Sequence, residues 1–482
     1  MRLVAGFILL PLSLTACASL PLMPEPTAVS TEAANIDVPT SWVEPAPNAL
    51  PSTDWVTAFN SPELSAIVGE ALSQNPNIRS ALAQFDASVS RVRSSRASLY
   101  PSAGLSSGVT RSEGGTGFLA GTTNYDLGLN AQWEADLFGR IRDQVGSAKA
   151  SAQASAADVA ATRLSIAGQV VQTWFDVIEA RLLADLSARE VETLERSLRL
   201  TQRRFEGGVT GSSDVRLARS SLASAQALQV VRLQNRDALM RGLETLLRRY
   251  PGADMDIPVN LPGLPTLSGA ASPDYVLTRR PDILAAERRM AQAGYDVDVA
   301  RKALYPSISL SAGASEQALK LSEVLDLKQL AFRLAGNLTA PIFQGGRLQA
   351  NIETQRALLQ AQLENYAQTV LTAYREVENA LDAESRLAER EAALLVSFEE
   401  ARKAEDRLEL RYSEGLATIL QLLDAQTRRL NAEGQLIGAR KERLANRVRL
   451  HLALGGGDYG QIQALPESKT PLPSLRAVKD IF

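Results

Sequence analysis

The sequence predicts a mainly α-helical fold with a membrane β-barrel, built from a duplicated helix-strand-strand-helix repeat. The duplication is visible in short motifs that recur at a fixed spacing: Tyr100-Pro101-Ser102 recurs 205 positions later as Tyr305-Pro306-Ser307. Two long stretches, 140–206 and 347–413, contain no proline. Between the helical stretches, four shorter segments alternate apolar with polar residues, the period of a half-buried strand.

The first 16 residues are expected to be a signal peptide. The apolar run that ends at Leu14 is too short to span a bilayer as a helix, which takes roughly 20 residues. The chain's one cysteine, Cys17, closes this run and resembles the lipidated cysteine of bacterial lipoproteins; the alternative is a buried free cysteine. Ala18 is not the aspartate that often marks inner-membrane retention. We therefore expect residues 17–60 to be an extended segment anchored by lipid at the outer membrane.

The duplication sets the remaining boundaries. We predict a first repeat at 61–250, a linker at 251–273, a second repeat at 274–454 and a tail at 455–482. Each repeat has the pattern of a short helix, two strands, a very long helix, a turn and a medium helix. Gly208 and Gly415 stand at equivalent places, where the two long helices are expected to end.

The long helices require neighbours along their length. About 67 residues at 1.5 Å each give a helix of roughly 100 Å, which an ordinary globular domain cannot hold. Leu194, Leu198 and Phe205 follow the 3/4 spacing of a packed helix seam, and a solvated coiled-coil stalk is the simplest alternative. The short and medium helices of a repeat could stack end to end along the long one.

Four segments are predicted as strands of about the length that a tilted strand needs to cross a bilayer. They are expected at about 101–111, 124–135, 306–314 and 331–342. One face is apolar and the other small or polar, as lipid and a watery lumen require, although soluble hairpins packed on a helix would alternate similarly. Four strands cannot close a barrel, since small barrels need about 8, and lipid does not tolerate an open edge. Several chains must therefore share one barrel.

Composition excludes several functions. With one histidine and one cysteine, the chain lacks the residues for a His-centred triad, a multi-His metal site or a CxxC zinc site. We therefore predict that it is not an enzyme and needs no cofactor or metal, and we expect His451 to be structural. A net charge of -3 provides no excess to hold a phosphate backbone, so nucleic acid is not expected as a partner.

Several motifs together resemble one known family. They are Asp136-Leu137-Phe138-Gly139-Arg140, Ala340-Pro341-Ile342-Phe343-Gln344-Gly345-Gly346-Arg347, and Arg411-Tyr412-Ser413-Glu414-Gly415 leading to Leu422-Leu423-Asp424-Ala425-Gln426. The chain is similar, from about Trp55 to Leu454, to the TolC family of outer-membrane efflux channels and particularly to its lipid-anchored NodT-type branch. The resemblance implies a homotrimer with a 12-stranded β-barrel and a long periplasmic α-helical barrel. The linker and tail would form an equatorial belt.

The resemblance also implies a gate at the periplasmic end. Asp424 matches one aspartate of the family's constriction ring, and its alternative role is that of a solvated surface carboxylate. Gln421 stands where a second aspartate is found, which halves the ring's charge from six to three per trimer and weakens cation preference. The helix-turn hinges would be Gly208 and Gly415.

Restraining contacts of the family match positions near these turns. Ser213 and Asp214 correspond to one side of the contact, with Tyr412 as the expected partner, while Ala417 replaces the family's arginine. For Asp214, capping of a helix N-terminus is an equal alternative, because it follows Gly211 at a helix start.

The function expected from these features is a passive exit channel in the outer membrane for drugs or other small molecules. Its partners would be outer-membrane lipid, a periplasmic adaptor (membrane fusion) protein and an inner-membrane RND-type transporter that supplies the energy. Two alternatives remain open: a channel for type I protein secretion, and a non-conducting coiled-coil lipoprotein that holds two membranes apart.

Overall fold

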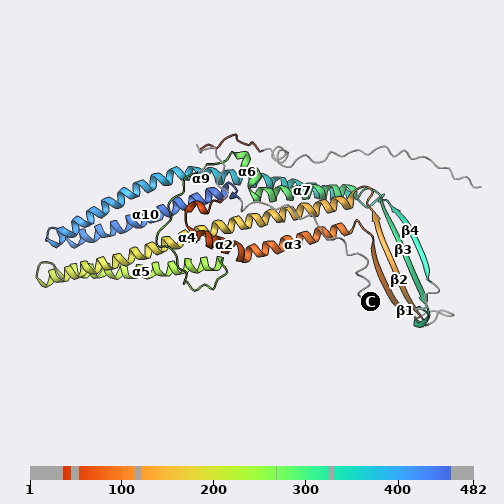
Figure 1. Cartoon of the computed structure of the whole chain (residues 1–482), viewed down its shortest axis with the longest axis horizontal. Helices are drawn as coiled ribbons and strands as arrows, with labels where there is room; N and C mark the ends of the chain where they lie inside the picture. The colour runs from red at the N-terminus through yellow and green to blue at the C-terminus, as the bar shows by residue number, and fades with distance from the viewer. Residues whose placement is uncertain (1–35, 45–53, 114–120, 268, 325–329, 458–482) are drawn as a thin grey trace, which may run out of the picture.

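The computed structural model describes residues 36–44, 54–113, 121–267, 269–324 and 330–457. The chain is elongated, with a sheet at one end and two helical hairpins at the other (Figure 1). The expected signal peptide, the expected lipid site Cys17 and most of the predicted tail lie outside the described residues. Within the described part, none of the helices combines the length and the apolar character needed to span a membrane.

Apart from one short helix in each half, both halves contain the same elements in the same order. In the first half these are the short 3-10 turn η1 (Thr57–Phe59), α2 (Pro62–Gln74), α3 (Pro76–Ala97), β1 (Ser102–Ser112), β2 (Thr122–Ala135), α4 (Arg140–Glu206) and α5 (Ser212–Leu246). In the second half they are α6 (Pro273–Arg279), α7 (Pro281–Lys302), β3 (Ser307–Ala318), α8 (Leu321–Val324), β4 (Ala331–Thr339), α9 (Arg347–Ser413) and α10 (Ile419–Ala453). The two uninterrupted long helices agree with the prediction from the missing prolines.

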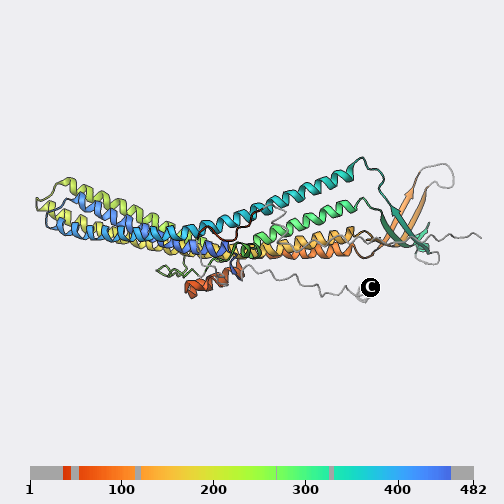
Figure 2. The same ribbon diagram turned by 90° about the horizontal axis from the view of Figure 1, so that it is seen from above.

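The helices of each half run as two columns. Helices α3 and α5 lie one after the other along α4, and α7 and α10 do the same along α9, as the length comparison suggested (Figures 1 and 2). Helix α4 also contacts α7 and α10, so it has neighbours on both sides. Although α4 and α9 are both 67 residues long, 27 residues of α4 are buried against 10 of α9. One long side of α9 is therefore bare within the described part of the chain.

The four strands form one antiparallel sheet in the order β1-β2-β3-β4. The register places the apolar residues of all strands on one face: Leu105 lies opposite Leu129, and Trp133 opposite Leu310. This face is exposed, with Leu334 85% accessible. Within the described chain neither β1 nor β4 has a partner on its outer edge. An apolar exposed face and two open edges fit a sheet that meets lipid and further strands.

Two predicted strand ends are wrong. The strand expected at 306–314 continues to Ala318, because β2 is long enough to pair with it as far as the Tyr125–Ala318 position. The strand expected at 331–342 ends at Thr339. Pro341 follows closely and has no backbone N–H to donate to a ladder, which explains the early end.

The middle of the molecule holds the largest apolar core. Trp55, Trp174 and Phe175 are buried there, and Ile257 brings the linker between the repeats into the same cluster. The ring of His451 stacks on Trp55 with centroids 5.8 Å apart. Burial lowers the pKa of His451 to about 4, so the imidazole is neutral in the fold.

Candidate periplasmic gate

The two hairpin tips, at the end opposite the sheet, are built alike (Figure 1). Gly208 and Gly415 have φ of +73° and +84°, a conformation that glycine adopts without steric cost. After each glycine, a backbone N–H returns to the last helical turn: Val209 donates to the Arg204 carbonyl and Leu416 to the Arg411 carbonyl, both at 2.8 Å. These are Schellman-type helix ends. A hinge role for the two glycines remains a prediction.

Tyr412 joins the two hairpins. Its side chain is buried, and its hydroxyl oxygen lies 2.8 Å from Oγ1 of Thr201 on α4. Because the Thr201 hydroxyl donates its one proton to the Ser197 carbonyl, Tyr412 must be the donor to Thr201. The guanidinium of Arg204 lies 4.7 Å from the centre of the Tyr412 ring and also donates to the Tyr412 carbonyl oxygen. The link therefore combines a hydrogen bond with a cation–π contact.

Within the described part of the chain, Tyr412 pairs with Thr201 and not with the expected Ser213 or Asp214. Ser213 is exposed. A restraining role for Ser213 and Asp214 remains a prediction. Asp214 is not the helix cap. Gly211 holds the N-cap position of α5, and Asp214 sits within the first turn, where a negative charge suits the positive end of the helix dipole.

Asp424 and Gln421 lie on an exposed side of α10. Oδ2 of Asp424 accepts a hydrogen bond of 2.8 Å from Nε of Arg428, one turn further along the helix. The carboxylate therefore carries its own counter-charge. Gln421 forms a capping box with Thr418: its N–H donates to the Thr418 hydroxyl at 3.3 Å, and its side-chain oxygen accepts from the Thr418 N–H at 3.0 Å. Gln421 thus has a structural task in starting α10.

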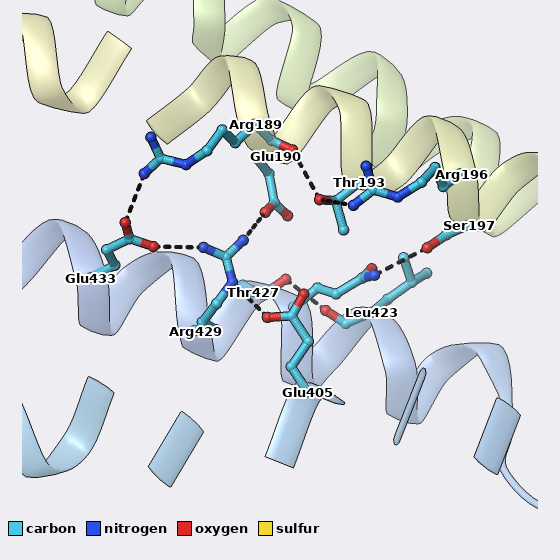
Figure 3. Close-up of polar contacts among 11 residues, drawn as sticks. Arg189, Glu190, Thr193, Arg196, Ser197, Glu405, Leu423, Thr427, Arg429 and Glu433 are labelled. Atoms are coloured by element: carbon cyan, nitrogen blue, oxygen red, sulfur yellow. Dashed lines mark hydrogen bonds and ion pairs between the residues drawn. The ribbon is translucent and has the colours of Figure 1, made fainter. Parts of the chain in front are cut away.

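A charged cluster that sequence reasoning missed lies farther from the tips (Figure 3). Arg429 on α10 pairs with three carboxylates: Glu190 on α4 at 2.7 Å, Glu405 on α9 at 2.5 Å and Glu433 on α10 at 2.7 Å. The side chains of Arg429, Glu190 and Glu405 are 12%, 5% and 8% exposed. Arg189 adds a second cation by binding Glu433 at 2.7 Å. One guanidinium therefore holds three helices together.

Burial sets the protonation of this cluster. It raises the pKa of Glu190 to about 7, against the opposing attraction of Arg429, and the neighbouring carboxylates Glu405 and Glu433 raise it further. Burial also raises the pKa of Glu405. One carboxylate of the cluster, Glu190, therefore titrates near neutral pH.

Removing the Tyr412 hydroxyl is expected to weaken the link between the hairpins. Tyr412→Phe should lower the free energy of unfolding by about 1 kcal/mol, the value of a typical buried hydrogen bond. Urea unfolding followed by the helical circular dichroism signal measures the change. Tyr250→Phe is the matched control, because Tyr250 is 88% exposed and should tolerate the loss unchanged. Equal effects of the two substitutions would contradict a role for the Tyr412 hydroxyl.

The chain is similar to known proteins over most of its length. The family model described as outer membrane efflux protein matches residues 67–247 and 273–456, which make up most of the chain and correspond to the two repeats. The pyoverdine export outer membrane protein OpmQ of Pseudomonas aeruginosa is 30% identical over 426 residues, covering 85% of this chain and 89% of OpmQ.

The chain is also similar to a protein described as a lipoprotein and to a solved channel structure. The probable outer membrane lipoprotein SilC of Salmonella typhimurium is 25% identical, over 86% of this chain and 90% of SilC. The solved structure of the outer-membrane channel OprN superposes with a TM-score of 0.77 at 28% identity, covering 90% of this chain and 96% of OprN.

Proposed function

Because the chain belongs to the outer membrane efflux protein family, we propose that it forms the exit duct of a tripartite pump for drugs or other small molecules. The protein is an outer-membrane efflux channel whose helices extend into the periplasm. It conducts passively, and the energy comes from a transporter in the inner membrane. The observation that carries this proposal is the sheet with one exposed apolar face, set on helices about 100 Å long.

Assembly into a homotrimer is the arrangement we propose. The four-stranded sheet leaves the outer edges of β1 and β4 unpaired, and backbone groups at such edges are costly in lipid. Three copies would supply 12 strands and close the barrel. The same closure would bring the bare side of α9 against a neighbouring subunit and form the periplasmic α-helical barrel.

The hairpin tips are the proposed docking place for a periplasmic adaptor. Val209, Leu416 and Leu420 are each 65% exposed there, and Leu217 is 45% exposed nearby. Exposed apolar side chains gathered at one end of an otherwise charged bundle favour a protein partner. An RND-type transporter would then deliver cargo through the adaptor. Acyl chains on Cys17 would strengthen the hold on the outer membrane.

Conductance separates this proposal from a non-conducting spacer lipoprotein. The full chain, purified in detergent and inserted into a planar bilayer, should give discrete channel openings, and its mass should be that of three chains. A protein of monomer mass without conductance would favour the spacer. Export of a small-molecule dye in cells lacking their own channel would distinguish drug efflux from type I protein secretion.

Asp424 is proposed to line the narrowest part of the duct, and its removal should widen it. Asp424→Ala is expected to raise single-channel conductance and, because Arg428 loses its partner, to shift ion selectivity toward anions. The matched control is Asp382→Ala, which breaks the same kind of exposed pair with Arg386, 2.7 Å apart on α9. If both variants conduct alike, Asp424 does not line the constriction.

A further inference from the structure

We infer that the cleft between the linker and helices α4, α9 and α10 binds a small apolar molecule that carries one carboxylate. Arg440 and Arg443 would hold the carboxylate, and apolar side chains of the linker and of α4 would enclose the rest of the molecule. The inference goes beyond the proposed channel, because conduction does not require such a ligand.

The cleft has the size of a small-molecule site. Its volume is about 430 Å³, and known ligand pockets measure roughly 300–1,000 Å³. Four parts of the chain form its walls: α4, α9, α10 and residues 260–264 of the linker. Its apolar lining includes Leu182 from α4, Phe398 from α9, and Leu261 and Leu264 from the linker. A ligand that fills this cleft therefore needs an apolar body.

Hydrogen bonds at two places fix the linker over these helices. Arg181 on α4 donates to the Ile257 carbonyl oxygen, and Nη1 of Arg447 on α10 donates to the Pro265 carbonyl oxygen at 2.6 Å. Between these two anchors, Leu264 packs against the central apolar core. The cleft is therefore formed before a ligand arrives, which limits the entropy lost on binding.

The polar wall of the cleft has more positive than negative groups. Three arginines line it, Arg189, Arg440 and Arg443, against two glutamates, Glu391 and Glu433. The two oxygens of Glu391 are both engaged: one accepts from Nε of Arg440 at 3.1 Å, and the other accepts from Nη1 of Arg443 at 2.7 Å. Three guanidinium groups minus two carboxylates leave one positive charge in excess.

Glu433 has no capacity to compensate this excess further. Its Oε1 accepts from Arg189 and its Oε2 from Arg429, both at 2.7 Å (Figure 3). Arg429 is balanced by two carboxylates of its own, Glu190 and Glu405. The buried cluster thus takes no net charge from the cleft, and the positive excess of the cleft remains.

Two arginines of the cleft keep N–H donors that have no acceptor within the described residues. Nε of Arg443 is buried and unbonded, and Arg440 uses only its Nε, so both of its Nη groups are available. A buried donor without a partner is costly, and a guanidinium presents its donors in a planar fork that fits an oxyanion. These donors and the excess charge favour an anionic ligand.

The size of the charge excess selects the kind of anion. A carboxylate carries one negative charge, which matches one excess positive charge. A phosphate monoester carries about -1.5 to -2 at pH 7 and would leave negative charge uncompensated in the cleft. A carboxylate on an apolar body is therefore the ligand that fits both the polar and the apolar wall.

Calorimetric titration of the full chain, held in amphipol so that no detergent micelles absorb the probe, tests the ligand class. Sodium octanoate should bind. Acetate, which lacks the apolar chain, and octanol, which lacks the charge, should each bind about tenfold more weakly or less. Octyl phosphate should also bind more weakly than octanoate, and tighter binding of octyl phosphate would overturn the assignment of a carboxylate.

Arg440→Gln tests the residues that hold the carboxylate and should weaken octanoate binding about tenfold. The side chain of Arg440 is 50% exposed, so the fold should tolerate the change. Arg449→Gln is the matched control. Arg449 is 48% exposed and pairs with Glu442 at 2.8 Å, much as Arg440 pairs with Glu391, but nine positions along α10 place it on the opposite side of the helix. Arg449→Gln should leave octanoate binding unchanged.

Thiol protection locates the bound probe. Ile437 lines the cleft, whereas Gln435 is exposed on another side of α10. At saturating octanoate, the thiol of Ile437→Cys should react about tenfold more slowly with an anionic methanethiosulfonate reagent, and the thiol of Gln435→Cys should react at an unchanged rate. The wild type measures the background from Cys17, its one cysteine.

Octanoate binding that is weakened by Arg440→Gln alone, with protection of Ile437→Cys alone, supports the site. No binding to the wild type, equal binding to the wild type and Arg440→Gln, or no protection of Ile437→Cys overturns it, and the arginine–glutamate pairs are then structural contacts only. None of these measurements uses conductance. Their failure therefore leaves the channel standing, and a protein that binds octanoate without conducting contradicts the channel and not the site.

Discussion

Arg429→Ala is expected to lower the free energy of unfolding by about 3–5 kcal/mol, because removal of one partner of a buried ion pair leaves charges that water cannot reach. Two carboxylates depend on this guanidinium, Glu190 and Glu405, and both are more than nine-tenths buried. Glu433 keeps its second partner, Arg189, and should be affected least. The three helices that meet at Arg429 would lose their common contact.

The neighbouring residue gives the matched control. Arg428 occurs one position earlier on α10, and its side chain is 73% exposed and paired with the exposed Asp424. Arg428→Ala should therefore leave the free energy of unfolding almost unchanged, because an exposed pair one turn apart contributes little. Urea unfolding of the full chain in detergent, followed by circular dichroism, compares the two variants. A similar small loss for both would show that the Arg429 cluster does not stabilise the fold.

Stability is also expected to fall as the pH rises through the range in which Glu190 titrates. Burial raises its pKa from the ordinary 4.5 to about 7 in the fold. Between these values the folded chain holds a proton that the unfolded chain has released, so this contribution is fully present below pH 4.5 and lost as the pH approaches 7. The loss should be on the order of 2 kcal/mol in the wild type and absent in Glu190→Gln.

Two other groups must be separated from this effect. The pKa of His451 is lowered to about 4, so its contribution grows as the pH rises from 4 to 6.5, but it is the same in wild type and variant and cancels in their difference. Although partial burial raises the pKa of Glu391, hydrogen bonds from Arg443 and Arg440 lower it overall. Glu391→Gln should therefore shift the stability curve between pH 5 and 8 without changing its slope. Parallel curves for wild type and Glu190→Gln would contradict the prediction.

The parts of the fold that could be predicted from the sequence are those that depend on local residue patterns. The long helices follow from the absence of proline between Gly139 and Gly207, and the strand faces follow from a period of two. The duplication then made each half a check on the other. Strand ends were less certain because pairing decides them: Ala318 is in a strand through its partner Tyr125, which no local pattern near 318 reveals.

The gate contacts could be predicted less well. Arg428 and Arg429 are adjacent arginines on one helix, yet one is exposed and the other buried. The difference arises from the rotation of about 100° between successive helical residues, and the partner Glu190 is 239 positions away. Thr201 and Tyr412 are likewise far apart in sequence, by 211 positions, so their contact could not be predicted. Family resemblance identified Tyr412 as a linking residue but did not indicate Thr201 as its partner within the chain.

The open edges of β1 and β4 have a genetic consequence. Each subunit has two unlike edges, and each edge pairs with another copy of the same chain. A subunit with a mutation at one edge can therefore still join a ring through its other edge. Every ring that takes up such a subunit carries the defect. Mutations on these sides should therefore act dominantly, and one faulty allele could spoil most channels in a cell that also makes the normal protein.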